Sequence, residues 1–167
     1  MSIYVSDLRE QVIKPCLEVL GDFSETGADL LMGTAAQESI AGPGFCPDRQ
    51  GLGIYRITIQ KHYEVWDKYL IQFPDLASLV RGLASQQQFL KNPHSELVGN
   101  LSYATAIAWM IYKSKLIDVQ KPTDLNNLAQ LWALQFDNGT GCTRRSEDFI
   151  DTYRVNLLSS ENQKLVA

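Results

Sequence analysis

The sequence predicts a mostly α-helical fold with one core, and three observations lead to this prediction. Apolar residues recur every three or four positions along most of the chain, as they do on one face of a helix. Residues 94–114 are apolar on nearly all sides, which is typical of a buried central helix. The length of 167 residues suits a single domain, with a core over about residues 6–158 and a tail over residues 159–167.

Two helices are expected before the first loop. Ser6 is a suitable cap for a helix over residues 6–21, in which Pro15 predicts a kink or break. A second helix is expected over about residues 25–39. The segment 41–53, AGPGFCPDRQGLG, has four Gly and two Pro, so we expect a loop there.

The region after the loop predicts one short extended segment and then further helices. Alternation of apolar residues over residues 54–59 indicates at most a small β segment near residues 52–59. Helices are then expected around Val65, from a cap at Asp75, around Leu128 and from Ser146. A Gly-containing loop is expected over residues 137–145, DNGTGCTRR.

Charge and apolar content exclude several classes of protein. The net charge is −4 and the pI is about 5.1, so no excess of Lys and Arg exists to bind a nucleic acid through its phosphates. The most apolar run, residues 101–112, is too short to span a bilayer, so we expect no membrane span. The first residues lack the apolar segment of a secretory signal peptide.

The cysteine and histidine content predicts no metal site and no cofactor. Three cysteines lie at long spacings and cannot all pair, which favours a reducing compartment over a disulfide scaffold. The two histidines are far apart in the sequence and show no metal-ligand spacing.

Glu38 is the candidate catalytic residue, because it lies on the apolar stripe of its helix and in the last turn. Burial and the negative end of the helix dipole both disfavour the charged form of a carboxyl. A carboxyl that keeps its proton near neutral pH can serve as a general acid. The alternative is a side chain that extends to solvent at the helix end.

Two other carboxylates and one basic pair also have a functional and a solvated-loop interpretation. Asp48 and Asp137 are candidates for a second carboxylate, although each also suits a solvated loop. Arg144 and Arg145 are interpreted as a solvated pair in a loop.

Four motifs in order resemble the lytic transglycosylase and goose-type lysozyme family, and most closely a bacteriophage branch of it. Residues 33–39, GTAAQES, resemble the catalytic Glu-Ser motif, and residues 52–55, LGIY, resemble the second motif. Residues 100–112, NLSYATAIAWMIY, are similar to the central buried helix, and residues 132–141, WALQFDNGTG, to the later cleft loop. The opening DLREQVIKPCLEVLG and the ending EDFIDTYR also resemble the phage branch.

The resemblance implies a lysozyme-like domain that cleaves the bond between N-acetylmuramic acid and N-acetylglucosamine in peptidoglycan. Glu38 would protonate the glycosidic oxygen and then act as the base that closes a 1,6-anhydro ring. A hydrolase normally uses a second carboxylate. The resemblance also implies substrate-binding roles for Ser39, Tyr55, Arg56, Thr58, Tyr103, Phe136 and Asn138.

The sequence departs from the family pattern at three places. Arg56 and Thr58 stand where the family usually has Gln and Glu, and Asp137 separates Phe136 from Asn138. A guanidinium from Arg56 beside Glu38 would favour the carboxylate and oppose general acid catalysis.

These observations leave three functional hypotheses. The first is an active glycosidase that acts on peptidoglycan glycan strands and is carried in a phage virion. The second is a virion structural protein that keeps the lysozyme-like fold, has lost activity and contacts other phage virion proteins. The third, ranked low, is a host-side sugar-binding module.

Overall fold

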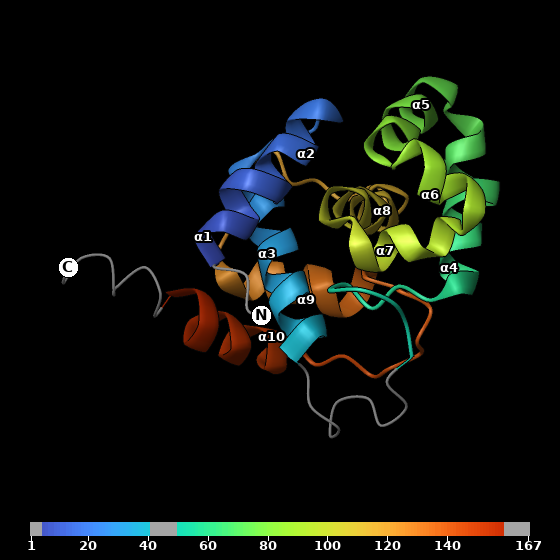
Figure 1. Cartoon of the computed structure of the whole chain (residues 1–167). Helices are drawn as coiled ribbons and strands as arrows, with labels where there is room; N and C mark the ends of the chain where they lie inside the picture. The colour runs from blue at the N-terminus through green and yellow to red at the C-terminus, as the bar shows by residue number, and fades with distance from the viewer. Residues whose placement is uncertain (1–4, 41–49, 159–167) are drawn as a thin grey trace.

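The computed structural model describes residues 5–40 and 50–158, which form helices joined by turns and loops, with no sheet among them (Figure 1). The predicted mostly α-helical class is confirmed. The buried apolar residues of these segments form one cluster, to which nearly every helix contributes.

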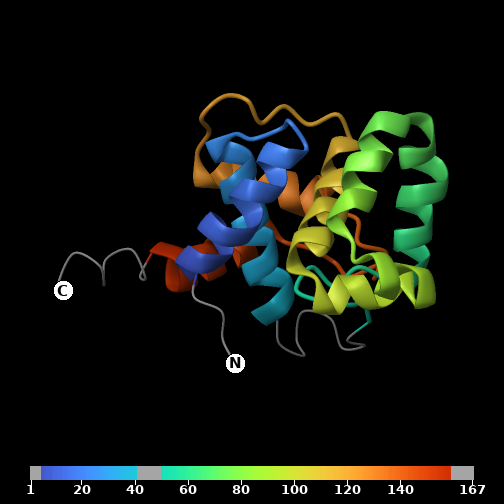
Figure 2. The same cartoon turned by 45° about the horizontal axis from the view of Figure 1, so that its top comes forward.

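The centre of the fold is α8, Leu101–Lys113, which lies between the N-terminal helices and the group α4 to α6 (Figures 1 and 2). All of its residues from Tyr103 to Tyr112 are buried. The expected helix over residues 94–114 is divided, however, into a 3-10 turn at Pro93–Ser95, α7 at Glu96–Gly99 and α8. Asn100 causes the break, because its extended backbone ends α7. Its side chain then caps α8 by accepting a hydrogen bond from the Tyr103 N–H.

Three consecutive segments form the N-terminal helix: α1 at Val5–Asp7, a π-helical turn η1 at Leu8–Ile13, and α2 at Lys14–Val19. Ser6 lies inside this helix, so its predicted capping role is wrong. Pro15 occupies the first turn of α2, where its missing N–H costs no helical hydrogen bond, and the π-helical turn precedes it. The predicted second helix is confirmed as α3, Glu25–Ile40.

The small β segment expected near residues 52–59 is reduced to one bridge, and no regular strand forms there among the described residues. A single antiparallel bridge joins Leu52 to Ile57, and Ile59 begins α4, Ile59–Glu64. Gly51 and Gly53 have positive φ angles of 94° and 71°, which fold the segment into a tight turn. The turn buries Tyr55 and Ile57, so the apolar alternation has a cause other than a strand.

A peripheral group of helices follows α4: η2 at Val65–Tyr69, η3 at Leu70–Gln72, α5 at Pro74–Leu83 and α6 at Gln86–Lys91. Asp75 lies inside α5 and Phe73 occupies the cap position, so the predicted cap at Asp75 is wrong.

The C-terminal part contains α9 at Leu125–Gln135, a loop, α10 at Ser146–Tyr153 and the π-helical η5 at Arg154–Leu158. Helix α10 packs against both α3 and α9, so these three helices form one layer beside α8. Within the described residues, no helix is both long enough and apolar enough to cross a membrane.

The contact between α3 and α10 depends on Gly33, and we expect Gly33→Ala to destabilise the protein. A Cβ at this position would lie 2.1 Å from Cζ of Phe149, whose side chain is fully buried and has little room to move. Overpacking of this kind costs about 1–3 kcal/mol. Denaturant unfolding measures the change.

The matched control is Gly82→Ala in α5, where the added Cβ would meet nothing within 4 Å. This variant should gain about 0.5–1 kcal/mol from the higher helix propensity of alanine. Equal stability changes in the two variants would contradict the packing argument.

Candidate active site

Helix α3 carries Glu38 in its last turn, with the side chain directed into the protein. The residue is only 1% exposed. Glu38 borders an open cavity of about 370 Å³, whose walls come from the end of α3, the tight turn after residue 50, and α7. The residues that line it are Glu38, Ser39, Gly51, Gly53, Ile54, Arg56 and Val98.

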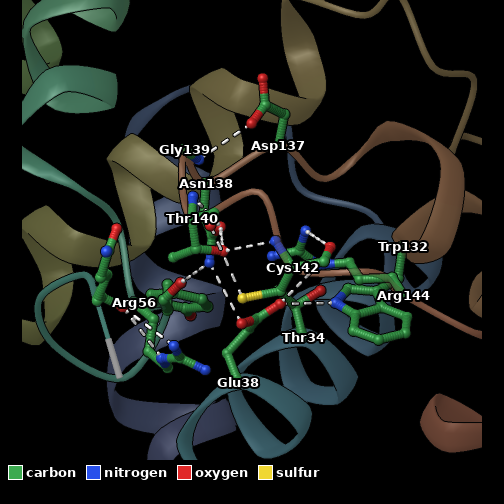
Figure 3. A network of polar contacts seen from close by, with 12 residues as sticks. Thr34, Glu38, Arg56, Trp132, Asp137, Asn138, Gly139, Thr140, Cys142 and Arg144 are labelled. Carbon is green, nitrogen blue, oxygen red and sulfur yellow. Dashed lines mark hydrogen bonds and ion pairs between the residues drawn. The ribbon is translucent and has the colours of Figure 1, made fainter. Parts of the chain in front are cut away.

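Three side chains donate hydrogen bonds to the Glu38 carboxylate (Figure 3). Trp132 Nε1 and Arg144 Nε reach Oε1 at 3.2 and 2.9 Å, and Asn138 Nδ2 reaches Oε2 at 3.2 Å. These donors match an ionised carboxylate, which accepts hydrogen bonds and donates none. Both carboxylate oxygens of Glu38 therefore accept hydrogen bonds from the protein.

Arg144 was expected to be a solvated loop residue, and that expectation is wrong. Its side chain is 7% exposed and forms a buried ion pair with Glu38. The guanidinium also lies 5.7 Å from the ring centroid of Trp132 and 5.5 Å from that of Phe136. In contrast, Arg145 is exposed and pairs with Asp148, as a solvated loop arginine does.

Asn138 fixes the loop after α9 against the tight turn and α4. Besides its bond to Glu38, Nδ2 donates to the Tyr55 carbonyl at 3.2 Å, and the Asn138 carbonyl accepts from the Thr58 N–H at 2.9 Å. Gly139 follows with a φ of 87°, and a Cβ there would lie 2.1 Å from Thr58 Oγ1. The loop therefore approaches α4 too closely for any residue except glycine.

The loop also contains a disulfide-bonded cysteine, Cys142, while Cys16 is free and buried. The expectation of a reducing compartment stays a prediction. The carbonyl of Cys142 accepts a bond from Arg144 Nη1 at 3.4 Å.

Arg56 lies at the cavity wall, but its guanidinium does not form the ion pair with Glu38. Its Nε and Nη2 donate to the Gln50 carbonyl at 3.3 and 3.1 Å. Arg56 has a positive φ of 50° within the tight turn. The cation beside the acid is Arg144, from a part of the chain that the motif comparison did not consider.

Ser39 and Thr58 make mainly local contacts. Ser39 lines the cavity, and its hydroxyl donates to the Ala35 carbonyl of the preceding helical turn at 2.5 Å. Thr58 caps α4, because its Oγ1 accepts from the Lys61 N–H at 3.1 Å. Thr58 thus positions α4 and the loop.

The three aromatic residues expected to bind substrate are buried in this structure, and their role in binding stays a prediction. Tyr55 and Tyr103 are 0% exposed and Phe136 is 3% exposed. Tyr55 Oη pairs with Thr105 Oγ1 at 3.0 Å. Phe136 stacks on Tyr112 with ring centroids 5.1 Å apart.

Asp137 does not join Glu38 as a second carboxylate. Its side chain points away from Glu38 (Figure 3) and pairs with Lys61 at 2.8 Å. Partial burial acts to raise the pKa of Asp137, but the Lys61 ammonium and the Gly139 N–H lower it overall. Asp48 lies outside the described residues. Within the described part of the chain, no three His, Cys, Asp or Glu side chains gather as a metal site.

A second buried carboxylate, Glu96, was missed by the sequence reasoning. It accepts bonds from Ser85 Oγ at 2.8 Å and Asn100 Nδ2 at 2.7 Å, and it borders a cavity of about 500 Å³. Burial acts to raise the pKa of Glu96, yet the bonds from Ser85 and Asn100 lower it overall. These contacts join α7 to the turn before α6, which indicates a structural role.

Tyr103 lies within a hydrogen-bond chain that the sequence did not indicate. Trp66 Nε1 donates to Tyr103 Oη at 2.8 Å, and Tyr103 Oη pairs with His62 Nε2 at 2.6 Å. His62 Nδ1 pairs with His94 Nδ1 at 2.8 Å, so one of these two nitrogens carries a proton. Burial lowers the pKa of both imidazoles.

We expect the buried histidine of this hydrogen-bond chain, His62, to make the folding stability depend on pH. Burial, assisted by repulsion from His94, lowers the pKa of His62 from 6.5 to about 4. Between these values the unfolded chain binds a proton that the folded protein does not bind. Stability is therefore complete above about pH 6.5 and is lost as the pH falls towards about 4, by about 3 kcal/mol.

Urea unfolding at about pH 7 and about pH 4.5 measures this loss, with His62→Gln as the comparison. The variant should show a smaller change between the two conditions. An equal change in wild type and variant would exclude His62 as the source.

Comparison with protein-family models, curated proteins and solved structures finds no match to this chain.

Proposed function

We propose that this chain is a peptidoglycan-cleaving glycosidase of the lytic transglycosylase or muramidase type, with Glu38 as general acid and base. The observation that carries the proposal is the buried Glu38 carboxylate at the end of α3, beside an open cavity. A buried carboxylate that borders an open cavity is a candidate for a general acid or base.

The carboxylate content of the described part of the cavity wall suits a lyase, which needs one such group. Glu38 is the one carboxylate among the described residues that line the cavity. An inverting hydrolase uses two, about 6.5–9.5 Å apart, whereas a lytic transglycosylase needs one group that first donates and then accepts a proton. The donors from Trp132, Asn138 and Arg144 support the second of these steps, in which Glu38 is ionised.

Product analysis on purified peptidoglycan tests this proposal. Mass spectrometry should detect muropeptides that end in 1,6-anhydro-muramic acid. Reducing ends without anhydro products would indicate a hydrolase. If no product forms on walls of several chemotypes, the enzyme proposal is wrong.

The ion pair between Arg144 and Glu38 supports a second candidate function. A guanidinium 2.9 Å from Oε1 opposes the protonated form that the first step requires. The chain would then be a virion structural protein with weak or no activity. In both cases we propose that the protein is carried in a phage particle and contacts other virion proteins.

A further inference from the structure

Arg144 has a buried nitrogen with no hydrogen-bond partner. Its side chain is 7% exposed, and Nη2 makes no hydrogen bond, while Nε binds Glu38 and Nη1 binds the Cys142 carbonyl. An unpaired buried donor costs about 1–3 kcal/mol, and native proteins contain few. The open donor therefore calls for a functional explanation.

The position of Nη2 follows from the shape of the guanidinium. The group is planar, and Nε and Nη2 lie on one edge with parallel N–H bonds. A carboxylate that binds this edge fully uses both of its oxygens. Here Oε1 of Glu38 binds Nε, but Oε2 is taken by Asn138 Nδ2 at 3.2 Å. One of the two N–H donors on this edge, that of Nη2, therefore has no acceptor. This N–H lies beside Oε1.

The charges on either side define which ligand atom suits this position. An oxygen bound to Nη2 would lie between a cationic donor and the carboxylate of Glu38. An anion would be repelled by Glu38 and an ammonium by Arg144. A hydroxyl group or a water molecule satisfies both partners, because it accepts from Nη2 and donates to Oε1.

We propose that Arg144 is a substrate-binding residue whose Nη2 holds the hydroxyl oxygen that Glu38 deprotonates. The inference rests on the proposed glycosidase function. After Glu38 has given its proton to the leaving oxygen, the bound hydroxyl attacks the anomeric carbon with an oxygen electron pair. The hydroxyl proton passes to Oε1, which restores the acid. The oxygen is the substrate's own C6 hydroxyl in the lyase and water in a hydrolase.

The test compares Arg144→Lys with the matched control Arg145→Lys. Lysine keeps the positive charge but has no second donor in a fixed fork. Loss of a donor to the reacting oxygen should lower kcat about 100-fold on purified glycan strands, with KM nearly unchanged. The ratio of anhydro to reducing products should also change. Arg145 is exposed and pairs with Asp148, so its variant should match wild type.

Arg144→Ala provides a second test if the lysine variant folds poorly by thermal unfolding. Added guanidinium ion should restore cleavage in a saturable way, and the same ion should leave Arg145→Ala unchanged. Wild-type kcat and product ratio in Arg144→Lys would overturn the inference and leave the glycosidase intact, as would a folded Arg144→Ala that guanidinium does not rescue. An inert wild type would overturn both proposals. A buried water as the sole partner of Nη2 would give variants that change stability without changing kcat.

Discussion

Glu38→Gln should abolish peptidoglycan cleavage. Glutamine keeps the shape of the side chain and one acceptor oxygen but has no transferable proton. Loss of general acid catalysis alone lowers the rate about 100- to 10,000-fold. Muropeptide release, measured by mass spectrometry over time, gives the size of the loss. Activity at the wild-type rate would exclude Glu38 as the acid.

The same substitution should also destabilise the protein, because it leaves the Arg144 guanidinium buried without its counter-charge. Removal of one partner from a buried ion pair costs about 3–5 kcal/mol, and the retained acceptor should place Glu38→Gln near the lower end. Thermal unfolding must therefore accompany each assay, so that rates are compared for folded protein.

Two substitutions serve as controls for this prediction. Asp137→Asn removes an exposed carboxylate that pairs with Lys61 and should leave cleavage unchanged. Arg56→Gln removes the cation that contacts Gln50 rather than Glu38. A large gain of activity in Arg56→Gln would show that this side chain influences the acid despite its contacts in the structure.

Gly53→Ala should cause the largest loss of stability among the glycine variants, together with loss of the cavity wall. Gly53 has a φ of 71°, and an added Cβ would lie 1.9 Å from the backbone carbonyl oxygen of Leu97. A backbone atom cannot move aside as a flexible side chain can, so the turn and α7 must separate. A left-handed conformation alone costs about 1–2 kcal/mol. The free energy of unfolding, measured in denaturant, should fall by more than this amount.

Gly21→Ala is the matched control, because Gly21 has nearly the same φ, 72°, and nothing within 4 Å of an added Cβ. This variant should lose only the conformational cost of about 1–2 kcal/mol. The difference between the two variants measures the clash with Leu97. Equal losses would show that the turn and α7 can separate at no cost.

The sequence could predict helices more reliably than their exact limits. Helices α3 and α8 are 16 and 13 residues long and buried on nearly all sides, and apolar runs of this length are longer than ordinary strands, so they predict helices. The segment near Tyr55 misled the prediction, because alternation fits both a strand and a turn with two buried side chains. The choice depended on positive φ angles at Gly51 and Gly53, which composition does not reveal.

The candidate site shows the same division between local and long-range information. The burial of Glu38 in the last turn of α3 could be predicted, because the end of a helix and the apolar residues beside it are read from neighbouring positions. Its partners could not all be predicted, since Trp132 and Arg144 lie 94 and 106 positions further along the chain. Trp132 lies at a position that the helical period assigns to the core. Arg144 lies in a loop whose composition is typical of a solvated segment.

The sequence by itself therefore determined the helical class and the position of one buried carboxylate. Only the tertiary structure decided which cation accompanies that carboxylate. Arg56 and Arg144 carry the same charge, and both belong to loops near the site. The turn at Arg56 directs its guanidinium to Gln50, while the packing of the loop after α9 brings Arg144 to Glu38. Coulomb attraction depends on distance in space, and distance along the chain does not fix it.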